Sequence, residues 1–211
     1  SWSDAPNGRR IWIGWVSNWK YARDIPTAPW RGLFSIPREL FLQQSSDGFH
    51  LIQKPIAELC KLRQTLFHCT ADDLDEVNTR LAGLALGPAV EIMLVFSSGT
   101  TGTFGLAVRV GAGEETIRGY NAQSQELFLD RRNSGDHFFY PDFGTLHSAP
   151  LVPDQGKIKL HIFVDSCSVE ILGNDGLVAI TALIVPDQDS QGMRIYGHES
   201  DACLENLDIW T

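Results

Sequence analysis

The sequence predicts an all-β protein whose main part is an antiparallel β-sandwich, and three observations support this prediction. Most of the 211 residues fall into short segments in which apolar and polar side chains alternate, which is the period of a strand with one buried face. Turns rich in Gly, Asp, Asn and Pro separate these segments. Asn174-Asp175-Gly176 lies between two of them and is typical of a β-hairpin. Successive strands at this spacing favour a sandwich.

The first part of the chain is expected to hold three strands, which lie at residues 10–17, 33–43 and 49–53. Their β-branched and aromatic residues favour extended structure. Three prolines exclude a helix between the first two strands, namely Pro26, Pro29 and Pro37. A turn is expected at residues 45–48. Residues 55–63 then suggest a short helix with Pro55 near its first turn, and we place a domain boundary near residue 65.

Beyond residue 65 the two-residue period dominates and predicts a series of strands. These strands are expected at residues 90–96, 103–110, 116–120, 126–129, 157–164, 169–172, 178–185 and 204–210. Residues 72–86 are ambiguous. Their leucines and valine fit one face of a helix, whereas Gly83 and Gly87 weaken a helical interpretation.

Composition limits the classes of function. The chain is 43% hydrophobic and 20% charged, which is typical of a protein with a buried core and not of a disordered chain. It has 17 Lys and Arg against 26 Asp and Glu, so the formal charge is 17 − 26 = −9. This balance argues against nucleic acid or an anionic membrane as a partner. No apolar run approaches the roughly 18 residues that span a bilayer. A neutral ligand such as a sugar is compatible.

Metal, cofactor and nucleophile motifs are not found in the sequence. There is no phosphate-binding glycine loop, no GxSxG and no HExxH, and the six histidines are scattered. We therefore expect no metal and no cofactor. The cysteines show no CxxC and no zinc spacing, so free thiols are favoured, with one or two disulfides as the alternative. These cysteines are Cys60, Cys69, Cys167 and Cys203.

The tryptophans are concentrated at the beginning of the chain. Five of the six lie in the first thirty residues, at Trp2, Trp12, Trp15, Trp19 and Trp30. Such a density indicates either a packed aromatic interface or a surface on which a ligand stacks. Together with the many carboxylates, it suggests a carbohydrate-related protein.

Specific blocks of sequence carry a family resemblance. Residues 8–22 (GRRIWIGWVSNWKYA), 26–32 (PTAPWRG) and 35–40 (SIPREL) resemble the last propeller blade of glycoside hydrolase family 32. That family contains invertases, inulinases, levanases and fructosyltransferases. Residues 129–135 (LDRRNSG) and 163–171 (FVDSCSVEI) resemble two signature strands of its C-terminal β-sandwich. The family's usual Asp-Arg-Ser-Ser reads Asp-Ser-Cys-Ser here, at residues 165–168.

The resemblance implies a domain organisation. We expect an antiparallel β-sandwich of the jelly-roll or concanavalin-like type at residues 66–211, preceded by a remnant of the last propeller blade at 1–54 and a linker with a short helix at 55–65. One blade cannot close a propeller ring. Leaving its tryptophans exposed would forgo burial worth about 25 cal/mol per Å². The segment is therefore expected to fray, to pair with a second copy or to dock on the sandwich, and the chain's start is expected to be a processed or truncated end.

The family's catalytic carboxyl groups are not expected in this chain. Retaining glycosidases need two carboxyl groups about 5–5.5 Å apart, and in this family they come from earlier blades. Asp4 imitates the nucleophile motif but lies one residue early, since Ala5 occupies the required position. Arg23-Asp24 is followed by Ile25 instead of proline, and Glu58-Leu59-Cys60 is not a Glu-Cys pair. We predict no catalytic residue and no activity for this chain alone.

Site residues follow from the resemblance position by position. Asn18 and Trp19 match the segment that lines the fructose pocket, so Trp19 is expected to contact the sugar, with a purely structural place between blades as the alternative. Residues expected to hold the blade to the sandwich are Trp30, Arg31, Arg38 and Glu39, the last three as ion-pair candidates. Residues expected to be sandwich scaffold are Asp130, Arg131, Asp165 and Glu170.

Three functional hypotheses remain open. The favoured one is the C-terminal portion of a secreted fructan- or sucrose-hydrolysing β-fructofuranosidase, whose partners are a fructose-containing oligo- or polysaccharide and an N-terminal propeller segment. The runner-up is a stand-alone fructan-binding sandwich. The third is a structural or oligomerisation module that associates through the tryptophan-rich segment.

Overall fold

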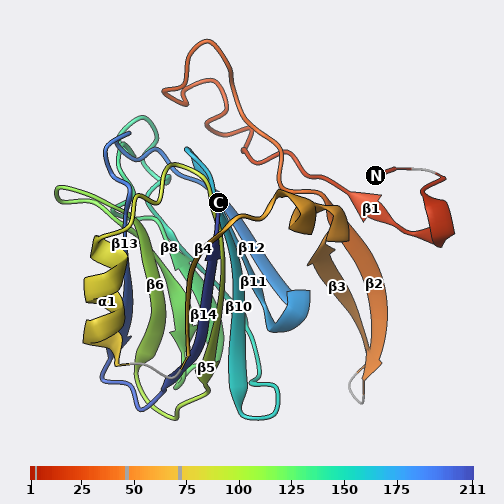
Figure 1. Ribbon diagram of the computed structural model, residues 1–211. Coiled ribbons are helices and arrows are strands. Elements are labelled where there is room, and N and C mark those ends of the chain that lie inside the picture. The colour runs from red at the N-terminus through yellow and green to blue at the C-terminus, as the bar shows by residue number, and fades with distance from the viewer. Residues whose placement is uncertain (3, 46–47, 71–72) are drawn as a thin grey trace.

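The computed structural model describes residues 1–2, 4–45, 48–70 and 73–211. Two antiparallel sheets stack face to face as a sandwich, and a smaller three-stranded sheet projects beside them (Figure 1). The predicted all-β fold with an antiparallel sandwich is confirmed.

The sandwich consists of a six-stranded and a five-stranded sheet. The larger sheet has the order β12 (Val178–Leu183), β11 (Ser168–Gly173), β10 (Lys157–Val164), β5 (Val90–Ser97), β14 (Leu204–Trp210) and β4 (Thr65–Thr70). The smaller sheet has the order β13 (Gly192–His198), β6 (Thr103–Val110), β7 (Thr116–Asn121), β8 (Glu126–Asp130) and β9 (Leu146–Pro150).

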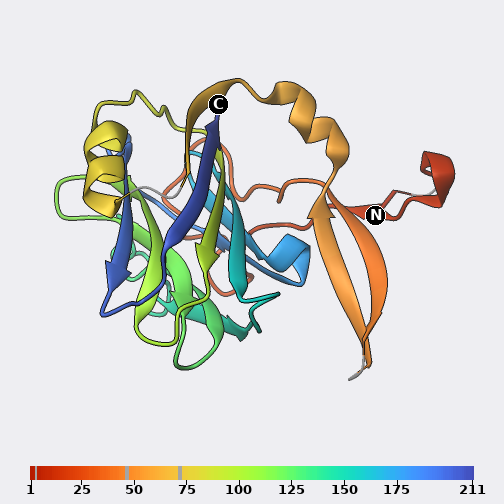
Figure 2. The same cartoon turned by 60° about the horizontal axis from the view of Figure 1, so that its bottom comes forward.

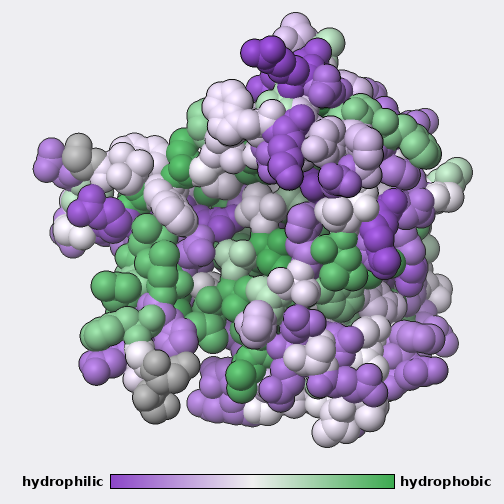
Figure 3. All heavy atoms as spheres, turned by 180° about the vertical axis from the view of Figure 1, so that it is seen from behind, coloured by the Kyte–Doolittle hydropathy of each residue, from purple (hydrophilic) through white to green (hydrophobic). Residues whose placement is uncertain are grey.

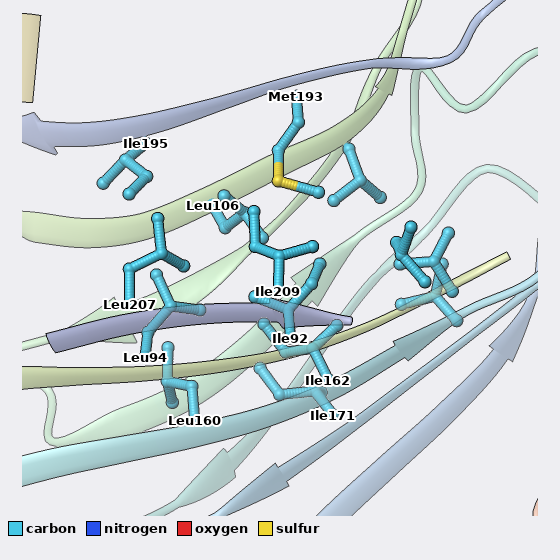
Figure 4. Close-up of a cluster of buried hydrophobic side chains, with 14 of the residues drawn as sticks. Ile92, Leu94, Leu106, Leu160, Ile162, Ile171, Met193, Ile195, Leu207 and Ile209 are labelled. Carbon is cyan, nitrogen blue, oxygen red and sulfur yellow. The ribbon is translucent and has the colours of Figure 1, made fainter. Parts of the chain in front are cut away.

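The main core lies between these two sheets and is built by strand alternation. Along β5, every second side chain is buried, including Ile92 and Leu94. Leu207 of β14 pairs with Leu94, and Leu106 and Ile195 of the opposite sheet face this layer (Figure 4). A fully buried aliphatic side chain of this size stabilises the fold by about 1.5–3 kcal/mol, so the alternation read from the sequence is the alternation that fills the core.

The ambiguous stretch contains the helix α1 (Leu74–Ala82). Asp73 caps it by accepting hydrogen bonds from the backbone N–H groups of the first turn, while Val77 and Leu81 are buried. The Asn78 amide exchanges two hydrogen bonds, of 2.8 and 2.7 Å, with the backbone of Ile195, which holds the helix on β13. The start of the ambiguous stretch, at residue 72, lies outside the described residues.

The N-terminal sheet has the order β1 (Ile11–Trp12), β2 (Arg38–Ser45) and β3 (Gly48–Pro55). Between β1 and β2 the chain is irregular except for a bridge that pairs Trp15 with Phe34, so the strands expected at 10–17 and 33–43 are shorter and later than predicted. Prolines supply no backbone N–H for a ladder in this stretch. Residues 46 and 47 of the expected turn lie outside the described residues, as does residue 3.

The linker contains the 3-10 helix η2 (Ala57–Leu62). It continues into Arg63, whose guanidinium lies 4.2 Å from the ring centroid of Trp210. The same group donates to both carboxylate oxygens of Glu91, at 2.6 and 2.9 Å. The linker is therefore held against the outer face of the six-stranded sheet (Figure 2).

A second apolar cluster joins the N-terminal segment to the sandwich. Val16, Tyr21 and Ile25 pack on Phe143 and Leu183. The N-terminal segment thus docks on the sandwich, and its pairing with a second copy stays a prediction. The four cysteines are thiols and not disulfides, and Cys69 is buried. Within the described ranges, no helix is long and apolar enough to cross a membrane.

Candidate functional site

Trp19 is presented to solvent by a tight turn. The backbone N–H of Lys20 donates to Asn18 Oδ1 at 2.9 Å, and the N–H of Tyr21 donates to the Asn18 carbonyl at 3.0 Å. This turn leaves Trp19 88% exposed. Its ring centroid lies 5.0 Å from that of Trp15 at an interplanar angle of 55°. We call these two indoles the Trp15–Trp19 face.

Tyr21, two residues after Trp19, is buried in an aromatic cage. Its ring centroid lies 5.3 Å from that of Phe143, edge to face, and 5.6 Å from that of Tyr140. The guanidinium of Arg131 covers Phe143 at 4.1 Å and donates to the Leu183 carbonyl at 2.9 Å. Burial lowers the pKa of Arg131, although the aromatic faces favour its cation. The cage fixes the Trp15–Trp19 face relative to the sandwich.

A pocket of about 460 Å³ lies between the N-terminal segment and the sandwich, and we call it the junction pocket. Trp12, Trp15 and Asn18 line one side, and His147 and Asp142 line the other. Burial and the nearby Arg131 cation lower the pKa of His147, so its imidazole is neutral at pH 7. Indole faces beside a few polar groups suit a neutral, hydroxyl-rich ligand.

A buried ion pair underlies the junction pocket. Arg38 Nη2 donates to Glu170 Oε2 and to the Thr181 hydroxyl, and Arg38 Nη1 donates to Gln53 Oε1 at 2.9 Å. The second oxygen of Glu170 accepts the backbone N–H of Ile36 at 2.6 Å. The side chains of Arg38 and Glu170 are only 7% and 4% exposed. The pair therefore joins β2 to β11 at the desolvated centre of the junction.

The other residues predicted to be structural are more dispersed. Glu39 accepts from Arg9 Nε at 2.9 Å within the N-terminal sheet, and Arg31 donates to the Thr27 carbonyl. Trp30 is half exposed, and its carbonyl accepts from the Thr27 hydroxyl at 2.8 Å. Asp130 and Asp165 lie away from the junction pocket: Asp130 pairs with Arg132 at 2.6 Å, and Asp165 accepts the Ser166 N–H at 2.7 Å.

The carboxyl groups that imitate the family motifs lie apart from the junction pocket lining. Asp4 is exposed on a backbone with φ 55°, and Asp24 is exposed in the turn after Tyr21. Glu58 forms a two-pronged ion pair with Arg9, at 2.6 and 3.0 Å, and the hydrogen bond from Arg9 lowers the pKa of Glu58 to about 2. A carboxyl with that pKa stays ionised at neutral pH and does not serve as a general acid. Across the described ranges, no group of three or more metal-binding side chains is suited to hold a metal ion.

Sequence reasoning missed the sandwich side of the junction pocket. Tyr140, Asp142 and Phe143 come from one loop whose sequence at 138–143 reads FFYPDF. This stretch has four aromatic residues in six positions and lies outside any strand. That density is the feature of the sequence that could have indicated a packed loop. Such a run is too apolar for a free loop, and here it covers Tyr21.

Known proteins resemble this chain along nearly its whole length. Residues 58–211 match the family described as "Glycosyl hydrolases family 32 C terminal", and residues 1–55 match "Glycosyl hydrolases family 32 N-terminal domain". The levanase of Bacillus subtilis (strain 168) is 42% identical over 99% of this chain and 32% of its own length. The extracellular exo-inulinase of Aspergillus ficuum is 36% identical over 88% of this chain and 35% of its own length.

The solved structure of the exo-inulinase from Aspergillus awamori superposes with a TM-score of 0.85 at 31% identity, over 95% of this chain and 40% of that one. The sucrose-6-phosphate hydrolase of Lactobacillus gasseri shares the fold, with a TM-score of 0.73 at 22% identity. The chain thus spans 32% and 35% of the two curated relatives above. With family matches that together cover its N-terminal sheet and its sandwich, the chain belongs to glycosyl hydrolase family 32.

Proposed function

We propose that this chain is the C-terminal portion of a β-fructofuranosidase-type hydrolase that acts on fructans or sucrose. The observation that carries the proposal is the Trp15–Trp19 face, which is fixed by the Tyr21 cage yet open to solvent. The likeness to a levanase and to exo-inulinases supports the substrate class. The catalytic carboxyl groups are supplied by a propeller segment outside residues 1–211.

In this proposal Trp19 forms one wall of the fructose pocket. An indole face attracts the C–H groups of a sugar ring through dispersion and its quadrupole. Asn18 holds the turn that aims Trp19 through its bond to the Lys20 N–H. A wall that contacts a sugar on one side only binds it weakly, so we expect weak or no fructan binding at this face in the chain alone.

The proposed contact surface for the propeller segment lies on the β2–β3 hairpin. Phe41, Leu42, Phe49 and Leu51 are exposed there, with Leu42 at 73% and Phe49 at 70%. Seen from behind, hydrophobic side chains gather over this hairpin (Figure 3). Exposed apolar patches of this kind mark interaction surfaces. The neighbouring propeller blade covers the patch in the whole enzyme, and pairing with a second copy is the alternative for the chain alone.

We also infer a secreted protein. The support is the likeness to exo-inulinases that are themselves named extracellular. The excess of acidic residues agrees with a neutral polysaccharide substrate outside the cell.

A chimera tests the proposed function. The C-terminal part of the B. subtilis levanase that aligns with this chain is replaced by residues 1–211, and fructose release from levan, inulin and sucrose is measured. We expect an active chimera, whereas residues 1–211 alone release no fructose. Trp19→Ala in the chimera is expected to lower kcat/KM by about tenfold or more, because a stacking contact of this kind is worth about 1–2 kcal/mol.

The matched control is Phe138→Ala, because Phe138 is 86% exposed and outside the junction pocket lining. It should leave kcat/KM unchanged. Fructose release by residues 1–211 alone contradicts the proposal, as does a folded chimera without activity. Light scattering of residues 1–211 that gives twice the mass of one chain favours the second copy as the partner of the hairpin patch.

A further inference from the structure

The outer face of the five-stranded sheet carries a row of four aligned residues. Cross-strand register places Tyr196 of β13 opposite Gly105 of β6, Gly105 opposite Gly119 of β7, and Gly119 opposite Phe128 of β8. Two aromatic residues thus stand at the ends of the row, with two glycines between them. Because glycine has no side chain, the row leaves room for the Tyr196 side chain, which reaches across Gly105 to Gly119.

The ring of Tyr196 is fixed across these two glycines. Its hydroxyl donates to the Arg118 carbonyl at 3.2 Å, and a Cβ atom on Gly119 would lie 2.5 Å from the Tyr196 oxygen. A side chain at Gly119 would therefore displace the phenol. Burial raises the pKa of Tyr196, so the phenol is neutral at pH 7. A ring held in this way loses little entropy when a ligand stacks on it.

Rows that end in polar residues flank the Tyr196 ring on both sides. On one side Arg194 of β13 is in line with Ile117 and Asp130, and on the other His198 is in line with Asn121 and Glu126. The hollow that these residues and the Tyr196 ring line has a volume of about 590 Å³. We call it the Tyr196 trough, which is lined by Thr103, Ile117, Asn121, Glu126, Phe128, Asp130, Arg132, Leu146, Ser148, Arg194, Tyr196, Gly197 and His198.

Both guanidinium groups of the trough are paired with carboxylates, whereas the Glu126 carboxylate accepts from the Ser148 hydroxyl at 3.2 Å. Arg194 Nη2 contacts both carboxylate oxygens of Glu115, at 2.7 and 2.9 Å, and Arg132 contacts Asp130 at 2.6 Å. An anionic ligand would compete with these carboxylates for the guanidinium groups. A cationic ligand would compete with the guanidinium groups for the carboxylates. A neutral ligand with many hydroxyl groups can instead accept and donate without breaking either pair.

The trough is separate from the junction pocket although the two share strands. On β9, Leu146 and Ser148 face the trough, whereas His147 between them lines the junction pocket. At the end of β8, Asp130 lines the trough and the next residue, Arg131, lines the junction pocket. Strand alternation thus puts two hollows on opposite faces of one sheet edge.

We propose that the Tyr196 trough is a second carbohydrate-binding site, which holds fructosyl units of an oligo- or polysaccharide away from the Trp15–Trp19 face. The assignment to fructosyl units rests on the proposed function, whereas the assignment to a neutral sugar rests on the fixed ring and the paired guanidinium groups. Tyr196 and Phe128 contact the sugar rings, and Asn121, Glu126 and the paired residues bind hydroxyl groups.

The test uses residues 1–211 and a fructose tetramer prepared from inulin, with binding measured by isothermal titration calorimetry. We expect saturable binding that Tyr196→Ala weakens by about tenfold or more. Tyr196→Phe keeps the ring and should bind within about threefold of the unchanged chain. Ser148→Trp is a second variant. Its indole fills the trough from an exposed position, and it should weaken tetramer binding at least as much as Tyr196→Ala. Thermal unfolding of each variant shows that it is folded.

Phe138→Ala serves as the matched control, because Phe138 is exposed and outside the trough lining, and it should leave this binding unchanged. The site is refuted if the unchanged chain does not bind the tetramer, or if Tyr196→Ala and Ser148→Trp fold and bind it normally. Equal binding of a glucose tetramer overturns the fructosyl assignment. The proposed function is tested separately, because sucrose hydrolysis by the chimera is expected to survive Tyr196→Ala. An inactive chimera with intact tetramer binding therefore rejects only the hydrolase assignment.

Discussion

A Cβ atom at Gly176 would lie 2.0 Å from the carbonyl oxygen of Gln53. The β11–β12 turn and strand β3 are thus in backbone contact, far in the sequence from each other. Together with the Arg38–Glu170 pair and the Tyr21 cage, this contact fixes the N-terminal segment to the sandwich at three places.

Gly176→Ala should therefore destabilise the protein more than glycine conformation alone explains. Gly176 has φ 89°, and Gly113 has φ 84° with nothing within 4 Å of its Cβ position. Both alanine variants incur strain of about 1 kcal/mol from positive φ. Gly176→Ala alone also pushes against the Gln53 backbone, so urea unfolding should show a clearly larger loss of stability. Equal losses would mean that the turn does not press on β3.

Glu170→Gln is expected to destabilise the folded chain by about 3–5 kcal/mol, because it leaves the buried Arg38 cation without its counter-ion. The measurement is the free energy of unfolding in urea. The combined change Arg38→Met with Glu170→Leu should recover most of the loss, since apolar replacement of a buried pair is often neutral. Lys157→Gln, which breaks an exposed pair with Glu205, is the control and should have little effect. A similar loss of unfolding free energy in Lys157→Gln would show that burial of the Arg38–Glu170 pair does not explain the effect.

The Glu91 cluster predicts a specific acid sensitivity. Burial alone would raise the pKa of Glu91, yet hydrogen bonds from Arg63 and His161 lower it from 4.5 to about 2. A carboxyl with a depressed folded pKa stabilises the protein fully above about pH 4.5 and loses that contribution as the pH falls towards 2. The melting temperature should fall less steeply over that range in Glu91→Gln than in the unchanged chain. Glu205→Gln is the matched surface variant, and its melting temperature should fall with pH as steeply as that of the unchanged chain. Equal steepness in all three proteins would show that Glu91 does not cause the acid sensitivity.

Arg118 is a buried cation whose removal should stabilise the protein. Its side chain is fully buried, and its Nε and Nη1 atoms have no hydrogen-bond partner among the described residues. Burial lowers the pKa of Arg118 to about 9. We expect Arg118→Met to raise the free energy of unfolding by about 1–3 kcal/mol, the cost of an unsatisfied buried polar group. Tetramer binding in the trough should persist, because Tyr196 bonds the Arg118 backbone and not its side chain. A loss of stability in Arg118→Met would show that this guanidinium has a favourable partner.

The alternation of apolar and polar residues along the sequence predicted most strands of the sandwich. Strands such as Lys157–Val164 alternate strictly, so their buried face can be read from sequence alone. Three strands were missed, namely β4, β9 and β13. The β9 sequence LHSAP has no β-branched residue, and β13 begins and nearly ends with glycine. Their strand structure comes from pairing with neighbours, which local propensity does not contain.

The candidate sites depend still more on distant pairing. The family resemblance pointed to Trp19, but the cage around Tyr21 required the loop at 138–143 to fold back on it. The Tyr196 trough arises because Gly105 and Gly119 meet in register with Tyr196. No short window of sequence shows that alignment, whereas each glycine alone suggests only a bend or a weak strand.

The three places that fix the N-terminal segment have a mechanical consequence. Tyr21, Arg38 and Gln53 are spread along the N-terminal segment, so this segment cannot pivot on the sandwich without breaking several contacts at once. The orientation of Trp19 is then governed by residues that do not contact its indole. A substitution inside the sandwich that shifts this segment would therefore also reorient the Trp19 indole.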